Sequence, residues 1–377
     1  MGLPGRSAPS QRLWTLLSLF LTFRAVRASQ CAAFDSSGNA YVFGTTYGDV
    51  SLGSNVTQPA TFVSITNQTG RPSFDGNTTQ CFTNQFTDGL YVLGGSVANP
   101  NDAYIFDFQG QTWSTQTTSG GPSGGYVAIL DHDTTTLYAF GNGSLNALAF
   151  SETAAKASSS ALQWQIGAAN GDPPFNTIGY QPVLGAANNH IQFLNTPASS
   201  PGDAYIYVIH YAYYQPTVQS FGNFPASHGQ TATIFSNSST SPYTFAFIPD
   251  NATSTYIINT QSNTTSSFAA PPFADPLASY AASSTQLLQL TSNGSLAFLD
   301  LGAPTNSWTV VDVSNMTASM NSTSANGGTS GSISGKSKAS SAVPSQNVKS
   351  DAENLKLPGL ATIVLAALTA VGYIMAS

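Results

Sequence analysis

Short apolar runs alternate with turn-forming residues through most of the chain. Between residues 29 and 313, groups of Val, Ile, Tyr, Phe and Leu are separated by Gly, Asn, Asp and Pro. This pattern predicts antiparallel strands joined by tight turns. One segment departs from it, because SETAAKASSSALQW (151–164) predicts a helix with Ser151 as its N-cap. The fold class is therefore expected to be all-β.

A hydrophobic hairpin recurs along the chain, mostly at intervals of about 40 to 50 residues, which is the period of a four-stranded propeller blade. One such unit cannot bury its apolar faces alone, whereas a closed ring of units can. We therefore predict a β-propeller of about six or seven blades, with a β-sandwich or β-helix as the competing fold. The recurring hairpins are CAAFDSSGNAYVFG (31–44), QCFTNQFTDGLYVLGG (80–95), YVAILDHDTTTLYAFG (126–141), VLGAANNHIQFL (183–194), TFAFIPDNATSTYII (244–258) and LLQLTSNGSLAFLD (287–300).

One segment carries a resemblance to a known repeat family. In GLYVLGGSVANPNDAYIFDFQGQTW (89–113), a double glycine at 94–95 is followed by Tyr104 and then by Trp113. This arrangement resembles a kelch repeat, and its NDAYIFDF portion is echoed by GDAYIYVI (202–209), without the double glycine and the Trp. The resemblance implies a kelch-like propeller for residues 29–313.

The N-terminus has the three parts of a secretory signal. Two Arg residues precede an 11-residue apolar run, LWTLLSLFLTF (13–23), and Ala28 is a small residue before a plausible cut. We therefore expect a signal peptide over residues 1–28, with cleavage after Ala28.

The C-terminal 21 residues, 357–377, are apolar and uncharged. They follow small residues at 350–352 and a short polar spacer, as in a glycosylphosphatidylinositol (GPI) attachment signal. We expect the lipid at Ser350, with Ser340 or Ser341 as alternative sites, and removal of residues 351–377. A retained membrane span and a buried core helix are the other interpretations of this tail.

Residues 314–350 differ from the body in composition. Ser or Thr occupies 15 of these 37 positions, and no aromatic residue is present. Such a segment buries too little apolar surface to offset the entropy of ordering it. We expect a disordered, O-glycosylated stalk.

Uncharged groups must supply most of the hydration of the protein surface, because only 7% of the residues are charged. Between residues 29 and 315, fifteen acids stand against two bases, Arg71 and Lys156, which argues against nucleic-acid binding. The pattern Asn-x-Ser/Thr indicates N-linked sugar instead. The ten acceptors are Asn55, Asn67, Asn77, Asn142, Asn237, Asn251, Asn263, Asn293, Asn315 and Asn321.

The chain has two cysteines, Cys31 and Cys81. In an oxidising compartment two such thiols usually pair, and closing this ring would stabilise the fold by roughly 3 to 4 kcal/mol in the chain-entropy model. Two free buried thiols are the alternative.

Candidate catalytic chemistry is sparse. Kelch-like propellers of secreted fungal proteins include copper-radical oxidases of the galactose oxidase type, a resemblance that implies a Cys cross-linked to Tyr, a second Tyr and two His ligands. The chain departs from that set, because its two cysteines are expected to pair with each other and its histidines show no paired ligand spacing. No metal or other cofactor is expected. The histidines are His132, His190, His210 and His228.

Two local clusters have competing interpretations. The acids of Asp131-His132-Asp133 could meet a cation, but the triplet stands where the sister hairpins turn, so a turn is preferred. Tyr205, Tyr207, Tyr211 and Tyr213 are predicted to alternate onto one strand face. They could contact sugar rings, although a half-buried blade face is the preferred interpretation.

Signal, sequon-rich body, stalk and lipid-attachment tail together resemble the fungal GPI-anchored cell-surface mannoproteins, including immunoreactive ones of encapsulated basidiomycete yeasts. The resemblance implies a non-enzymatic glycoprotein of membrane and cell wall, in part shed, that host mannose receptors bind and that acts as a T-cell antigen. Its expected partners are the membrane, through the lipid, and wall polysaccharide and mannose-binding receptors, through its glycans. The alternatives are a carbohydrate-binding propeller and, less favoured, a copper-radical oxidase.

Overall fold

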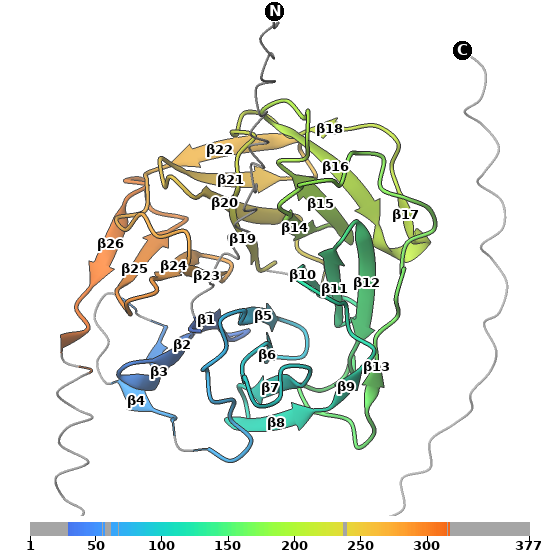
Figure 1. The fold of residues 1–377 in the computed structure, drawn as a ribbon. Helices are drawn as coiled ribbons and strands as arrows, with labels where there is room; N and C mark the ends of the chain where they lie inside the picture. Colours follow the sequence, from blue (N-terminus) through green and yellow to red (C-terminus); the bar gives the residue numbers. More distant parts are fainter. Residues whose placement is uncertain are drawn as a thin grey trace, which may run out of the picture. The chain divides into compact units, whose positions relative to one another are not determined.

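The computed structural model describes residues 29–316 except 55, 57–61, 67, 237–239 and 315. Their fold is a six-bladed β-propeller, in which antiparallel sheets surround a central axis (Figure 1). The prediction of an all-β propeller is thus confirmed, and the blade number is six. No helix in the described part of the chain has the length and apolarity needed to cross a membrane. The expected signal peptide and lipid-attachment propeptide lie outside the described residues, as does nearly all of the expected stalk.

The first three blades follow one another along the chain, and in each blade the strands run in sequence order from the axis outward. Blade 1 consists of β1 (Cys31–Phe34), β2 (Ala40–Thr45), β3 (Gly48–Gly53) and β4 (Val63–Ser64). Blade 2 consists of β5 (Gln80–Asn84), β6 (Gly89–Leu93), β7 (Ala103–Asp107) and β8 (Thr112–Gln116). Blade 3 consists of β10 (Val127–Asp131), β11 (Thr136–Gly141) and β12 (Ser144–Ala149), and a parallel pair lies beside it, β9 (Thr118–Ser119) with β13 (Leu162–Gln163).

The last three blades repeat this order. Blade 4 consists of β14 (Val183–Ala187), β15 (His190–Leu194) and β16 (Asp203–Val208), and β16 also pairs with β17 (Tyr213–Tyr214) and β18 (Gln219–Ser220). A 3₁₀ turn, η1 (Ile209–Tyr211), follows β16. Blade 5 consists of β19 (Gly229–Ile234), β20 (Thr244–Pro249), β21 (Thr255–Asn259) and β22 (Thr264–Phe268). Blade 6 consists of β23 (Ser279–Ala282), β24 (Gln286–Leu290), β25 (Leu296–Asp300) and β26 (Trp308–Val311).

The recurring hairpins hold different places in their blades. The first four are formed by the two innermost strands, such as β1–β2 and β5–β6. The last two are β20–β21 and β24–β25, which are the second and third strands. The innermost strand of blade 5, GQTATI, is too polar to stand out as an apolar run, and a long connection (235–243) separates it from β20.

The helix predicted over 151–164 is wrong. The segment consists of bends and ends in β13. Its contacts with the sheets replace helical hydrogen bonds, since the Ser158 N–H donates to the Gln116 side chain (2.6 Å) and the Trp164 indole donates to Thr118 Oγ1 (3.3 Å). Weak helix propensity is overridden by this packing.

The core lies between neighbouring blades. Between blades 1 and 2, the Trp113 ring of β8 packs against Phe43 of β2 (5.5 Å between ring centroids) and Phe106 of β7 (5.1 Å). Trp113 is the tryptophan of the kelch-like segment, and its role here is packing between blades.

Among the described residues, no blade combines strands from the first and the last part of the propeller. Side-chain contacts therefore join blades 6 and 1. The Ala32 N–H of β1 donates to Ser279 Oγ of β23 (3.0 Å), and the Tyr47 hydroxyl donates to the Gly294 carbonyl (3.1 Å). Met316, two residues into the segment expected to be stalk, is buried in the apolar cluster that both blades share. The packed body therefore reaches at least Met316.

Candidate functional site: the central cavity

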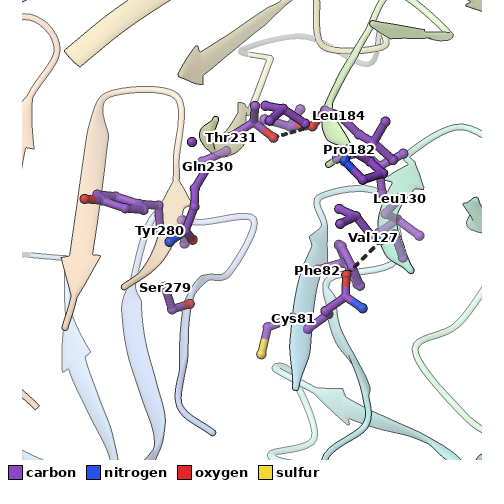
Figure 2. A pocket seen from close by; sticks show the side chains of 18 of the residues that line it. Cys81, Phe82, Val127, Leu130, Pro182, Leu184, Gln230, Thr231, Ser279 and Tyr280 are labelled. Carbon is purple, nitrogen blue, oxygen red and sulfur yellow. Dashed lines mark hydrogen bonds between the residues drawn. The ribbon is translucent and has the colours of Figure 1, made fainter. Parts of the chain in front are cut away.

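The six innermost strands enclose a cavity of about 460 Å³ on the propeller axis (Figure 2). Each blade contributes wall residues from its first strand. One such residue from each blade, in order, is Ala32, Cys81, Val127, Leu184, Thr231 and Ser279.

Each innermost strand pairs with its own blade on one side only, which leaves peptide groups at its other edge. Buried peptide groups need partners, and side chains of the neighbouring blade supply several of them. Gln80 of blade 2 accepts from the Ala128 N–H of blade 3 (2.8 Å). Thr231 of blade 5 donates to the Leu184 carbonyl of blade 4 (Figure 2), and Gln230 donates to the Pro276 carbonyl before β23 (2.7 Å). The cavity wall is thus held together by cross-blade hydrogen bonds.

A disulfide joins blades 1 and 2 at the same wall. It connects Cys31 of β1 to Cys81 of β5, whose Cα atoms are 5.8 Å apart. The predicted pairing of these cysteines is confirmed.

We call the two ends of the cavity the floor and the mouth. The floor lies where the first strand of each blade turns into the second, and Phe235 and Ser236, which directly follow β19, lie there. Gln85 of blade 2 exchanges two hydrogen bonds with the backbone of Ser236 of blade 5, donating to its carbonyl (3.3 Å) and accepting from its N–H (2.8 Å). Blades 2 and 5 stand opposite each other in the ring (Figure 1), so this pair bridges the axis.

His132 is buried at the floor. Its ring lies between Phe86 (6.5 Å between centroids) and Phe235 (6.0 Å). Burial lowers the pKa of His132 to about 4, so the ring is neutral near pH 7. Its Nδ1 atom is buried without a hydrogen-bond partner.

The mouth is the opposite end, where the chain enters each innermost strand. The exposed lining residues all lie there: Thr78, Gly124, Gly125, Gln181 and Pro276. Gln30, also at this end, is buried and donates to the Ser292 carbonyl (3.3 Å), and its Oε1 atom has no partner. Among the described residues lining the cavity there is no Asp, Glu, Lys or Arg.

The predicted tyrosine stripe is not one continuous strand face. Strand β16 ends at Val208, and Ala212 adopts a left-handed conformation (φ 53°) that reverses the chain after η1. Tyr207 is buried against Tyr214 (5.2 Å between centroids), and Tyr205 packs on Phe175 (5.1 Å). Only the other two are exposed, Tyr211 at 74% and Tyr213 at 40%.

The histidines are dispersed. His190 starts β15, His210 lies exposed in η1, and His228 pairs with Asp250 before β19 (2.7 Å). Within the described ranges, no three His, Cys, Asp or Glu side chains are grouped as a metal would require. Both cysteines are consumed by the disulfide, so neither is available for the Cys–Tyr cross-link of a copper-radical oxidase.

The Asp131-His132-Asp133 triplet forms a turn, as the preferred interpretation held. Strand β10 ends at Asp131 and β11 begins at Thr136. Asp131 is buried and accepts from Thr134, and burial raises its pKa, while Asp133 is exposed and accepts from Ser241. The two carboxylates therefore have different surroundings and partners.

Five of the ten predicted glycan acceptors fall on described residues, and all five are exposed in turns or bends. Antiparallel strands alternate in direction, so the two strands that a turn connects determine whether the turn lies at the mouth end or at the floor end. Four of the five belong to the mouth end: Asn77, Asn142, Asn251 and Asn293. Asn263 lies between β21 and β22, at the floor end. The remaining acceptors, Asn55, Asn67, Asn237, Asn315 and Asn321, lie outside the described residues.

The glutamines of the cavity could not be recognised from the sequence, although Cys81, His132 and His228 are candidates for other roles. Gln30, Gln80 and Gln230 look like ordinary polar residues before or within short strands, and only closure of the ring brings them to one axis. A signal was nonetheless present, because Gln80 is the first residue of β5 and Gln230 the second of β19, both innermost strands in which hydrophobic residues would be expected.

A comparison with models of known protein families found no match, and neither did a comparison with curated protein sequences. The kelch-like and mannoprotein resemblances therefore rest on the residues already quoted.

Proposed function

We propose that the chain is a secreted, N-glycosylated propeller, carried on an O-glycosylated stalk and anchored to the outer face of the plasma membrane by a GPI lipid at Ser350. In this proposal it is a mannoprotein of the cell surface and wall, partly shed, without an enzymatic role. Its glycans make its contacts with wall polysaccharide and with mannose-binding receptors of a host, through which it becomes a T-cell antigen.

The observation that carries the proposal is the exposure of the acceptors. Asn142 and Gly143 form a two-residue hairpin turn in which both residues have positive φ (51° and 76°), so Asn142 stands out from the sheet. One hydrogen of its side-chain amide binds the Ser123 carbonyl (2.9 Å), and the second remains for substitution by a sugar. Asn77, Asn251, Asn263 and Asn293 are likewise exposed.

Surface charge gives a second line of support. A body with fifteen acids and two bases can form few ion pairs, and uncharged sugar would supply the hydration that charged side chains supply elsewhere. The clustering of four acceptors at the mouth end would concentrate that sugar on one side of the propeller.

The experiment is to express the full chain in a yeast and treat intact cells with phosphatidylinositol-specific phospholipase C. We expect release of the propeller into the medium, with a C-terminal peptide that ends at Ser350 and carries the anchor glycan without its lipid. A matched variant that stops at Ser350 should appear in the medium without the enzyme. A cell-bound mature protein that still contains Tyr373 would contradict the anchoring.

A further inference from the structure

The central cavity combines a floor bridged by Gln85 and Ser236, an open mouth and a wall in which the described residues include no Asp, Glu, Lys or Arg. Its volume of about 460 Å³ lies in the range of about 300 to 1,000 Å³ that is usual for small-molecule sites. The wall is partly apolar, with Phe82, Val127, Leu130, Pro182 and Leu184 among its residues (Figure 2). A ligand for this space must offer both apolar and polar surface.

Two buried polar atoms of the lining lack partners, and they lie at opposite ends of the cavity. Gln30 Oε1 is near the mouth, on a side chain that is 8% exposed, and His132 Nδ1 is at the floor, on one that is 5% exposed. A buried polar atom without a partner is costly, and in native proteins each such atom calls for an explanation. Groups on a bound molecule would provide one.

The chemistry of these atoms restricts the ligand. Gln30 Oε1 can only accept a hydrogen bond, whereas His132 Nδ1 donates or accepts according to its tautomer. A hydroxyl group satisfies both, because it donates and accepts. A carboxylate could not donate to Gln30, and an ammonium group would find no carboxylate in the lining.

We propose that the central cavity is a binding site for a neutral saccharide of one or two residues, which enters at the mouth and extends toward the floor. Its hydroxyls donate to Gln30 Oε1 and pair with His132 Nδ1, while its C–H faces pack on Phe82, Val127 and Leu184. The bridge from Gln85 to Ser236 keeps the floor shut, so the saccharide enters and leaves at one end.

The test uses the secreted propeller with its stalk, after endoglycosidase treatment so that its own sugars do not compete. D-mannose, D-glucose and D-galactose are titrated by saturation-transfer NMR and calorimetry. We expect at least one to bind with a dissociation constant below about 1 mM, the affinity of a small ligand with a few good contacts. Failure of all three sugars to bind would overturn the proposal and would leave the proposed function standing, because lipid anchoring and glycosylation do not depend on the cavity.

Two variants locate the site. Gln30→Leu and His132→Phe should each weaken binding about two- to tenfold, the value of one hydrogen bond. Gln261→Leu, at an exposed turn away from the cavity, should bind as the wild type does. Unchanged affinity in both cavity variants, with melting temperatures that show them folded, would place the sugar elsewhere and overturn the proposal.

A comparison on the wild-type protein avoids any loss of folding. D-Glucosamine and D-glucuronate match D-glucose in size and carry opposite charges. Because the described lining holds no Asp or Glu to pair with an ammonium group and no Lys or Arg to pair with a carboxylate, both should bind at least tenfold more weakly than D-glucose or the best neutral sugar. Equal binding of the charged sugars would contradict a site in this cavity.

Discussion

Arg71 forms a two-point ion pair with Asp49, whose carboxylate is fully buried. The Arg71 Nε donates to Asp49 Oδ2 (2.5 Å) and Nη2 donates to Oδ1 (2.6 Å), while the guanidinium lies over the Phe74 ring, 4.8 Å from its centroid. Asp49 belongs to β3 of blade 1, and Arg71 to the crossover into blade 2. One of the two basic residues between residues 29 and 315 therefore anchors the connection from blade 1 to blade 2.

The first prediction concerns this pair. Arg71→Leu leaves the Asp49 carboxylate buried without its counter-charge, so the free energy of unfolding should fall by about 3–5 kcal/mol. Urea denaturation followed by tryptophan fluorescence measures it. Lys156→Leu removes the other base, which is exposed, and should change the stability by less than about 0.5 kcal/mol. Equal effects of the two substitutions would contradict the structural role of Arg71.

The second prediction concerns the disulfide between β1 and β5. Replacing both Cys31 and Cys81 by Ala should lower the free energy of unfolding by roughly 3 to 4 kcal/mol, because the unfolded chain regains the freedom of a loop with a sequence separation of 50 residues. The variant should be compared with wild type under oxidising and reducing conditions. A reductant should destabilise the wild type and leave the stability of the variant unchanged. If the reductant destabilised both proteins equally, the loss of stability would not come from the Cys31–Cys81 disulfide.

The propeller could be predicted from the sequence because its signal is local and repeated. Hairpins with apolar strands recur at the period of a blade, and the Trp113 segment marks one blade clearly. The error arose where the local signal was weak, because residues 151–164 have helix-forming composition but are held by Gln116 and Thr118. Contacts distant in sequence determine the backbone of this segment.

The cavity could not be predicted in the same way. Gln30 and His132 lie about a hundred residues apart. Gln30 belongs to no motif, and the Asp131-His132-Asp133 triplet indicates a turn and not a cavity. They come together only because six first strands converge on one axis, which is a property of ring closure. The glycan acceptors are the contrary case, since Asn-x-Ser/Thr is a local pattern and the five described acceptors occupy the exposed turns that such a pattern favours.

The third prediction concerns those acceptors. Peptide mapping after enzymatic deglycosylation in heavy-oxygen water should show mass-labelled Asp at positions 77, 142, 251, 263 and 293. Asn77→Gln should remove one glycan and leave the melting temperature nearly unchanged, because Asn77 is exposed in a surface bend and has no positive φ. Unlabelled Asn at all five positions in protein secreted from yeast would contradict the proposed glycan coat.

The fourth prediction concerns the pH dependence of stability. The unfolded chain takes up a proton on His132 near pH 6.5, while burial keeps the folded ring neutral down to about pH 4. Between these values the unfolded state binds more protons, so stability falls as the pH is lowered, by up to about 3 kcal/mol. The raised pKa of the neighbouring Asp131 acts in the opposite direction. The measurement is therefore the difference between wild type and His132→Phe.

Wild type should lose stability relative to His132→Phe from pH 6.5 to pH 4, because only wild type has a buried imidazole to protonate. Gln261→Leu is the matched control, since Gln261 is exposed in a turn and carries no titratable group, so its replacement should leave the pH profile as in wild type. A stability difference between wild type and His132→Phe that does not vary with pH would show that His132 titrates normally.

The last prediction concerns Phe235, which closes the floor of the cavity. Its ring packs on His132 and on the apolar cluster of blades 1 and 6. Phe235→Ala should therefore cost about 3–5 kcal/mol and admit water to the floor, so that the pKa of His132 returns toward its ordinary value. NMR titration of the His132 ring measures this shift. Phe86→Ala removes the ring on the other side, which is 38% exposed and outside the core clusters, so it should cost less and move the pKa less. If both variants leave the pKa of His132 where it is in wild type, the aromatic rings are not what keeps water from the floor.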